Sequence, residues 1–198
     1  PVITSNGGGS SAGISYSENG TSTVTTVTST DDASSTATYS ISGTDANDFS
    51  INSSSGALSF ISSPNYESPT DSDSNNSYEV VVTVTDNTSL TDTQTLTITV
   101  NDENEAPVIT SNGGGSSAGI SYSENGTSTV TTVTSTDVDA SSTATYSISG
   151  TDVDDFSINS SSGALSFSSS PNYESPTDSD SNNSYIVVVT VTDNTFLT

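Results

Sequence analysis

Residues 91–100 read Thr-Asp-Thr-Gln-Thr-Leu-Thr-Ile-Thr-Val, and the last apolar residues of this stretch alternate with threonine. Successive side chains of a β-strand point to opposite faces of a sheet, so the alternation predicts a strand with one buried face. Threonine is β-branched and suits a half-buried pleated surface. The same period of two recurs upstream at Val80, Val82 and Val84. The pattern favours an all-β protein.

The chain repeats itself almost literally. Residues 1–6, Pro-Val-Ile-Thr-Ser-Asn, recur as residues 107–112, and the inserted residue Val138 accounts for a one-residue shift between the copies. A period of about 106 residues is the length of a whole domain rather than of a solenoid turn. The sequence therefore predicts two copies of one domain.

The two predicted domains share a short linker. Repeat 1 covers residues 1–105, the linker covers 101–107 and repeat 2 covers 106–198. Repeat 2 reaches only the counterpart of Thr91, so we expect it to lack its last strand within this sequence. We interpret the chain as part of a longer array.

Turn-forming runs, such as Asn-Gly-Gly-Gly at residues 6–9, separate the predicted strands. Val24 and Val27 are three residues apart, which indicates a bulge or a change of facing in their strand. Seven short strands in about 100 residues are typical of an immunoglobulin-like Greek-key sandwich. In repeat 1 we predict strands near 1–4, 12–17, 21–29, 36–42, 48–52 with 57–61, 78–86 and 92–101.

Differences between the copies indicate which side chains face outward. Positions that accept both a charge and a hydrocarbon are expected at the surface or in loops. Three pairs behave in this way: Glu79 with Ile186, Ile61 with Ser168, and Ser89 with Phe196. The predicted inward valines of residues 80–84 recur as Val187, Val189 and Val191.

Charge restricts the possible functions. The chain has 24 acidic side chains and no Lys, Arg or His, which gives a formal net charge of -24. Without basic side chains it cannot displace the counterions of nucleic acid, and an anionic membrane surface repels it. We expect no nucleic-acid partner and no membrane insertion in this segment. Self-repulsion of this size opposes a compact state unless cations neutralise it.

The residue inventory also argues against catalysis and disulfides. With no His, Cys, Lys or Arg, a serine nucleophile has no ordinary base, and we predict that the chain is not an enzyme. Hydrophobic residues make up 28% of the chain, so the core is thin. A domain with a thin core and no disulfides usually needs another source of stability, and a bound metal ion is the expected one.

Carboxylates gather at the predicted strand ends. Calcium takes six to eight oxygen ligands from carboxylates, carbonyls and amides, so these clusters predict Ca²⁺ sites. The clusters contain Glu18, Glu67, the linker Asn101-Asp102-Glu103-Asn104-Glu105-Ala106-Pro107, the pair Asp137 and Asp139, and Asp193.

The order of these clusters along the chain resembles that of cadherin repeats, specifically the cadherin-like modules of large bacterial surface proteins. The resemblance covers essentially the whole chain. It implies a cadherin-type sandwich and about three calcium ions at the junction between successive repeats. The implied ligands are Glu18, which would bridge two ions, Glu67, Asp102, Asn104, Glu105, Asp137, Asp139 and Asp193.

The chain departs from the cadherin pattern at three places. Asn65 replaces the first acid of the family's Asp-Arg-Glu turn, and the linker is one residue shorter than usual. In repeat 1 the Asp-x-Asp motif is contracted to adjacent aspartates. We therefore predict weaker calcium ligands at Asp31, Asp32 and Asp86. Glu124 and Glu174 repeat the half-site of Glu18 and Glu67 in repeat 2 and are also predicted as weaker ligands, because this sequence does not contain their linker.

One further acidic motif has the one-three-five spacing of an EF-hand loop. It is Asp71-Ser72-Asp73-Ser74-Asn75, repeated at residues 178–182, but it lacks the glycine and the glutamate that an EF-hand needs. We predict an ordinary loop, with a weak accessory calcium site as the alternative. The recurring aromatic residues are predicted to lie in the core.

Three functions fit these observations. The first is a calcium-rigidified structural repeat of an extracellular adhesin stalk or surface fibre, whose partners are neighbouring repeats and homotypic copies. The second is a homophilic or glycan-binding adhesion module. The third is a filament subunit that assembles by strand donation, in which another chain supplies the last strand of repeat 2.

Overall fold

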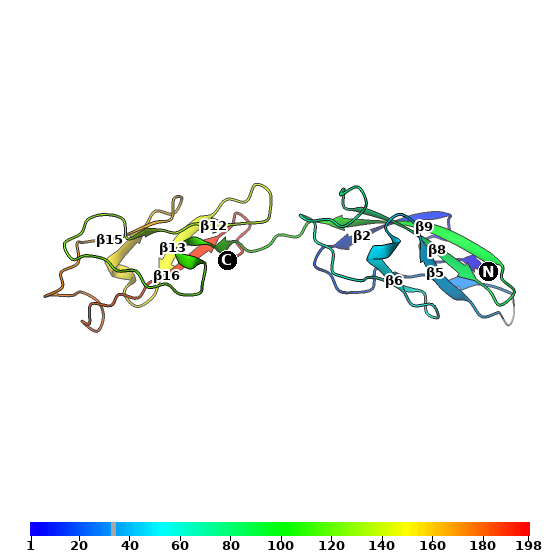
Figure 1. Cartoon of the computed structure of the whole chain (residues 1–198), viewed down its shortest axis with the longest axis horizontal. Coiled ribbons are helices and arrows are strands. Elements are labelled where there is room, and N and C mark those ends of the chain that lie inside the picture. Colours follow the sequence, from blue (N-terminus) through cyan, green and yellow to red (C-terminus); the bar gives the residue numbers. More distant parts are fainter. Residues whose placement is uncertain (33–34) are drawn as a thin grey trace. The chain divides into compact units, whose positions relative to one another are not determined.

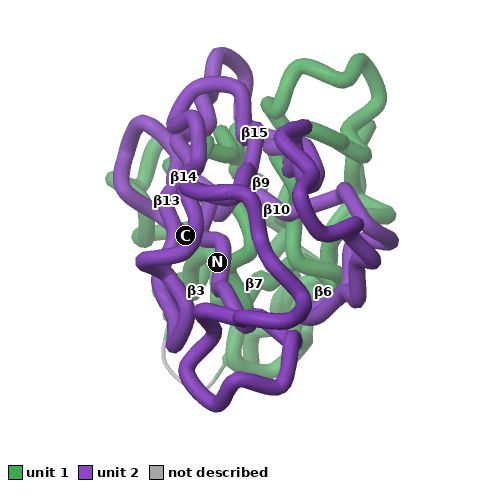
Figure 2. The backbone as a smooth tube through the Cα atoms, turned by 90° about the vertical axis from the view of Figure 1, so that its left-hand side faces the viewer, with its two compact units in different colours: residues 1–103 green, residues 104–198 purple. Residues whose placement is uncertain are grey.

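The computed structural model describes residues 1–32 and 35–198, which form two compact units, residues 1–103 and residues 104–198 (Figure 2). Strands dominate both units, with single-turn 3-10 helices between some of them. None of the helices in these described ranges is long and apolar enough to cross a membrane.

The strands of unit 1 form two main sheets (Figure 1). The larger sheet has the order β2-β9-β8-β5, the smaller has the order β3-β7-β6, and β1 pairs with β4. The elements are β1 (Val2–Ile3), β2 (Ser11–Ser17), β3 (Thr25–Thr26), β4 (Ser29–Thr30), β5 (Thr38–Ser42), η1 (Ala46–Asp48), β6 (Phe49–Ile51), β7 (Ala57–Phe60), β8 (Ser77–Thr85) and β9 (Thr91–Asn101).

The core of unit 1 lies between these sheets, as the alternating pattern predicted. Val80, Val82 and Val84 on β8 are 0% exposed, and they share one hydrophobic cluster with Phe49 and Leu58 of the smaller sheet. The aromatic rings also join the two sheets: the centroids of Phe49 and Phe60 are 4.3 Å apart, and Phe60 meets Tyr78 edge-on at 5.1 Å. The fold is an all-β sandwich.

The predicted strand at residues 21–29 is interrupted. Thr25–Thr26 pairs with β7, whereas Ser29–Thr30 pairs with β1, so the chain changes its pairing partner between them. Val27 lies at the change and is fully buried. The three-residue spacing of Val24 and Val27 predicted such a change of facing, but the sequence did not show that the strand would break in two.

The positions that differ between the copies face outward, as predicted. Ile186 is 61% exposed and Ile61 is 64% exposed, and their counterparts Glu79 and Ser168 are also at the surface. Phe196 is 86% exposed. These substitutions therefore leave the core unchanged.

Unit 2 contains smaller sheets than unit 1. They are β10-β12, β11-β15-β14 and β13-β16. The elements are β10 (Val108–Ile109), η2 (Ser111–Gly113), β11 (Thr131–Thr132), β12 (Ser135–Thr136), β13 (Thr145–Ser149), η3 (Val153–Asp155), β14 (Phe156–Ile158), β15 (Ala164–Phe167) and β16 (Val188–Thr192).

The described residues of unit 2 form fewer paired strands than those of unit 1. Residues 117–123, which have the same sequence as β2, form no strand, and β16 is four residues shorter at its beginning than its counterpart β8. In unit 1 both of these segments pair with β9. β2 is an edge strand that pairs with β9, so its counterpart in the described part of unit 2 has no neighbouring strand to complete its hydrogen-bond ladder.

Candidate metal centre

The strand pairing of unit 1 brings the first two predicted ligands to one end of a sheet. β2 and β9 run parallel, with Ser17 opposite Asn101. Glu18 and Asp102 are the next residues along these strands, so both carboxylates leave the sheet at the same edge. The backbone N–H of Glu18 donates to Asn101 O at 3.1 Å and continues the ladder by one bond.

The carboxylate of Glu18 is buried and held from both sides. Its side chain is 3% exposed, Oε2 accepts the backbone N–H of Tyr66 at 2.8 Å, and Oε1 accepts that of Glu103 at 2.9 Å. Each carboxylate oxygen has two lone pairs, so one on each oxygen is left for a cation. The N–H groups of Tyr66 and Glu103 therefore hold the Glu18 carboxylate in an orientation that leaves it able to bind a hard cation.

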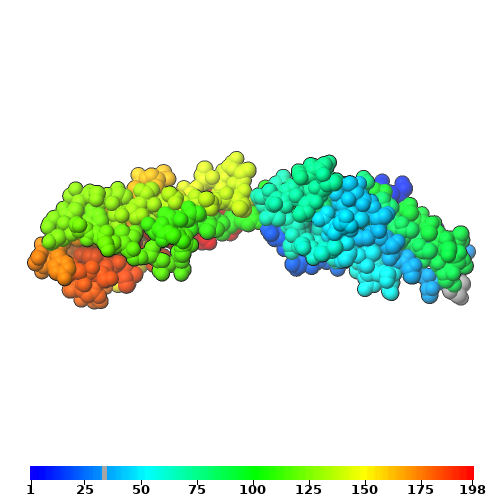
Figure 3. Space-filling view, in the orientation of Figure 1, coloured from blue at the N-terminus to red at the C-terminus, as the bar shows by residue number. Residues whose placement is uncertain are grey.

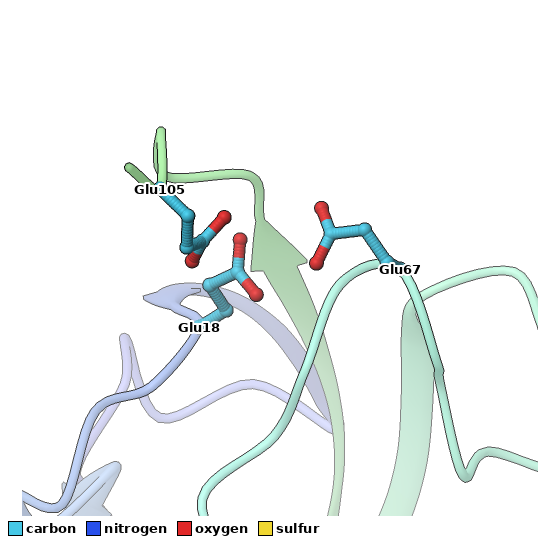
Figure 4. Close-up of side chains that lie close together, drawn as sticks. All are labelled: Glu18, Glu67 and Glu105. Atoms are coloured by element: carbon cyan, nitrogen blue, oxygen red, sulfur yellow. The ribbon is translucent and has the colours of Figure 1, made fainter. Parts of the chain in front are cut away.

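Glu67 completes the acidic group of unit 1. Figure 4 shows its carboxylate and that of Glu18 on neighbouring segments, and the two approach within 4.8 Å through one oxygen each. A carboxylate oxygen of Asp102 also lies within 4.8 Å of one on Glu67. Glu105, the third side chain drawn in Figure 4, belongs to unit 2.

Unit 2 gathers five of the predicted ligands near its first residues. Nδ2 of Asn104 donates to Oδ2 of Asp193 at 2.6 Å, and the backbone N–H of Glu105 donates to Oδ2 of Asp139 at 2.8 Å. Asp137 joins them because its Oδ1 accepts the backbone N–H of Asp139 at 3.1 Å. The Asp-x-Asp motif and the linker residues are thus in direct contact within unit 2.

Asp193 is held in its ionised form. Burial acts to raise the pKa of Asp193, but hydrogen bonds from the Asn104 side chain, from Thr195 and from the Leu197 N–H outweigh it and lower the pKa to about 2. The N–H groups of Thr195 and Leu197 both donate to Oδ1 at 2.8 Å. An ionised carboxylate is the form that binds a cation.

Comparison with known proteins gives a specific result for the first unit. The profile of the cadherin domain matches residues 13–101. The first repeat is therefore similar to a cadherin domain. Repeat 2 has nearly the same sequence, so the chain is built from cadherin-like repeats. A comparison with curated protein sequences finds no match.

Solved structures of cadherin ectodomains share the fold. Human protocadherin-24 EC1-2 has 18% sequence identity and a TM-score of 0.56, with 98% of this chain and 94% of that chain covered. Drosophila N-cadherin EC1-4 has 22% sequence identity and a TM-score of 0.54, with 93% of this chain and 44% of that chain covered. The human desmocollin-1 ectodomain has 21% identity and a TM-score of 0.52, with 99% of this chain and 38% of that chain covered. The chain therefore spans less than half of the latter two structures.

The family supplies a general expectation for the acidic groups. Cadherin domains are extracellular adhesion modules and bind Ca²⁺. The carboxylate and carbonyl oxygens that both units present are the donor set that calcium prefers. The residues present therefore fit this ion.

Among the described residues, the weaker predicted ligands of repeat 1 are not part of these acidic groups. The described residues contain no cluster of three or more acidic groups at metal-binding spacing that includes Asp31, Asp32 or Asp86. Oδ1 of Asp31 accepts the backbone N–H of Asp32 at 2.7 Å, and Oδ1 of Asp86 accepts the N–H groups of Thr88 and Leu90, both at 2.8 Å. Burial raises the pKa of Asp86, but these bonds keep it below its ordinary value.

In repeat 2 the counterpart of Glu18 is more open, whereas Glu67 and its counterpart Glu174 are both exposed. Glu124 is exposed and keeps one of the two anchors of Glu18, the N–H of Tyr173 at 3.1 Å. Glu174 donates its backbone N–H to Oδ1 of Asn172 at 3.0 Å, whereas in repeat 1 Oδ1 of Asn65 accepts the N–H of Ser68 at 2.7 Å.

The EF-hand-like loops are stabilised by their own aspartates. Asp71 is 4% exposed and accepts the N–H of Asn75 at 2.8 Å, and Asp178 accepts that of Asn182 at the same distance. Hydrogen bonding to Asp71 raises the pKa of Asp73. These bonds are those of a capped turn.

Sequence reasoning missed the groups that hold the ligands. The N–H of Glu103 anchors Glu18, and the Ser142 hydroxyl donates to Oδ2 of Asp137 at 2.5 Å. Glu103 stands inside the predicted linker, so its place in that run was a signal for a role beside Glu18. No comparable signal marked Ser142.

Proposed function

We propose that this chain is a structural segment of an extracellular protein, in which calcium joins successive cadherin-like repeats and stiffens the array. The observation that supports this most is the arrangement of the predicted ligands within each unit. Glu18, Glu67 and Asp102 gather at the last residues of unit 1, and Asn104, Glu105, Asp137, Asp139 and Asp193 gather at the first residues of unit 2. Along the chain, only Glu103 lies between Asp102 of the first group and Asn104 of the second.

Charge gives the physical reason for calcium. Seven of these eight ligands are carboxylates, and the chain has no Lys, Arg or His that could neutralise them. Like charges at such spacing repel strongly unless cations balance them. About three divalent ions would offset nearly the whole charge. Removing the ions would leave the repulsion and separate the two ligand groups.

Stiffness can be measured directly, since the chain has no native cysteine. Spin labels on Thr44→Cys and Thr151→Cys, which are exposed positions, report the distance between the two units. We expect one narrow distance distribution in calcium and a broad one in excess chelator. Equal widths in the two conditions would refute calcium stiffening.

Matched variants separate a specific site from a general salt effect. Asp139→Ala removes a predicted ligand, whereas Asp154→Ala removes an exposed acid elsewhere in unit 2. Calorimetric titration should show the strongest calcium binding lost in the first variant and kept in the second. If sodium chloride at equal ionic strength narrowed the distribution as calcium does, the charge would be a salt-adapted surface and the proposed ligand set would be wrong.

A cadherin fold also serves adhesion, and the same protein tests that function. Purified chains on beads would cluster in calcium if the repeats were homophilic modules. We expect the beads to stay dispersed, because a structural segment needs only its neighbours along the array. Calcium-dependent clustering would assign the chain to adhesion instead.

A further inference from the structure

The loop that carries Glu67 has no strand pairing to hold it. Residues 61–76 connect β7 with β8 and contain no strand. Most of their side chains are exposed, and Figure 3 shows this loop, turquoise, at the surface of unit 1. A loop of this length has many conformations unless specific contacts restrict it. Those contacts therefore decide where the Glu67 carboxylate lies.

Asn76, the last residue of this loop, contacts both segments that carry the acidic group of unit 1. Its Nδ2 donates to the backbone O of Tyr66 at 2.9 Å, and its own backbone O accepts the N–H of Val100 at 2.9 Å. Tyr66 directly precedes Glu67, and Val100 stands two residues before Asp102. Asn76 thus connects the loop that carries Glu67 with the strand that leads to Asp102.

The backbone of Tyr66 extends this connection to Glu18. Its O accepts the Asn76 amide, and its N–H donates to Oε2 of Glu18 at 2.8 Å. These two bonds restrain the peptide groups on either side of Tyr66, and the second of these peptide groups leads into Glu67. One side-chain amide therefore bears on the positions of two carboxylates.

The backbone conformation of Asn76 is one that glycine adopts more readily. Its φ is 64°, in the left-handed region that favours glycine and tolerates asparagine. Its Oδ1 is buried and has no hydrogen-bond partner in the described part of the chain. The bond that Nδ2 donates to Tyr66 is therefore what asparagine adds here over glycine.

The same contacts recur in repeat 2. Nδ2 of Asn183 donates to the backbone O of Tyr173 at 3.1 Å, and the N–H of Tyr173 donates to Oε2 of Glu124, also at 3.1 Å. Asn183 has a φ of 65°, close to that of Asn76. The connection from asparagine through tyrosine to glutamate is thus a property of the repeat rather than of one loop.

We infer that Asn76 is a positioning residue for the acidic group of unit 1. Its amide fixes the peptide group between Tyr66 and Glu67, and thereby sets how the carboxylates of Glu18 and Glu67 face each other. The consequence for calcium rests on the function proposed above. Removing a group that orients metal ligands typically weakens metal binding by about 10- to 100-fold. Asn76 carries no charge, so this effect acts through geometry.

The test replaces the amide and leaves the backbone unstrained, with Asn76→Gly in the full chain. Amide exchange is read residue by residue by NMR in excess chelator. We expect the Tyr66 N–H to exchange about fivefold faster, the effect of one lost hydrogen bond. Calorimetric titration of the same variant should show the strongest calcium binding weakened about tenfold.

Two control variants separate positioning from stability. Asn52→Ala removes the acceptor of the Ser54 and Ser55 N–H groups, both at 3.0 Å, in another turn of unit 1. It should lower the urea midpoint of unit 1 without changing Tyr66 exchange or calcium affinity. Asn183→Gly removes the equivalent amide of repeat 2, and should speed exchange at Tyr173 only.

Three results would overturn the inference. They are wild-type exchange of Tyr66 in Asn76→Gly, equal acceleration of that exchange by Asn52→Ala, and unchanged calcium affinity of Asn76→Gly. A wild-type chain that bound no calcium would instead refute the proposed function. The exchange measurement needs no calcium, so it would still decide whether Asn76 holds the acidic group.

Discussion

The two repeats form a comparison in which nearly the same sequence adopts two structures. Residues 11–17 and 117–123 are both Ser-Ala-Gly-Ile-Ser-Tyr-Ser, yet the first is a strand and the second is not. Their neighbours also match, and what differs is the presence of β9. Strand formation here is decided by the pairing partner rather than by local propensity, as expected for strands in general.

The difference extends from the core to the metal ligands. Glu18 follows a strand fixed by β9 and is 3% exposed, whereas Glu124 follows an unpaired segment and is exposed. Tyr16 is 8% exposed, and its counterpart Tyr122 is partly exposed. One strand therefore orders both the hydrophobic core and the acidic edge of a repeat.

The largest expected effect in this comparison comes from a charge placed in the core. Val82→Asp puts an unpaired carboxylate at a position that is 0% exposed, which should cost more than about 4 kcal/mol and unfold unit 1. Val189→Asp in unit 2 should cost less, because this side chain is only partly buried and lines a cavity in that unit. Urea unfolding, followed by hydrogen exchange in each unit, measures both costs. Equal costs would show that Val189 is as fully buried in solution as Val82.

A smaller effect is expected at the acidic edge. Glu18→Ala leaves the part-buried N–H groups of Tyr66 and Glu103 without their acceptor, and should destabilise unit 1 by about 2 kcal/mol. Glu124→Ala, its counterpart, removes one bond at an exposed site and should change stability by at most about 0.5 kcal/mol. Thermal unfolding in excess chelator removes the contribution of calcium. A Glu124 variant as unstable as the Glu18 variant would contradict the assigned role of the second anchor.

The smallest expected effect concerns an interaction that both repeats have. Asp152 accepts the N–H of Ile186 at 2.6 Å and that of Ser179 at 2.8 Å, as Asp45 does with Glu79 and Ser72. The bonds from Ile186 and Ser179 lower the pKa of Asp152 below its ordinary value. A lowered pKa stabilises the folded state above the unfolded value near 3.9, and this contribution is lost as pH falls through the folded pKa.

Urea midpoints measured for unit 2 between pH 7 and pH 2.5 test this contribution. The wild type should lose more stability below pH 4 than Asp152→Asn, which has no carboxylate to titrate at this position. The difference should be modest, because a protonated carboxyl group still accepts one hydrogen bond. Parallel pH profiles for the two proteins would show that Asp152 does not contribute.

Much of the fold could be predicted from periodicity and from the repeat. The alternating valines of β8 identified the buried face, and the substitutions at residues 79 and 186 identified the exposed one. The loss of strand at residues 117–123 could not be predicted from their own sequence, which is identical to that of a strand. It depends on pairing with a segment about 80 residues away along repeat 1.

The sequence predicted the charged residues of the candidate site but not the groups that hold them by hydrogen bonds. Carboxylates at strand ends are visible in a sequence, and their order resembled that of a known family. The N–H of Glu103 that holds Glu18 is not visible, because every residue except proline has a backbone N–H group and only the folded chain shows which one is used.

The parallel pairing of β2 and β9 has a mechanical consequence. When opposite ends of unit 1 are pulled, the force enters β9 from its last residue and β2 from its first, so the strands are drawn past each other lengthwise. The hydrogen bonds from Ser11 to Asn101 then carry the load together instead of opening one at a time. Unit 1 is thereby built to bear tension along the chain, a property suited to a tether.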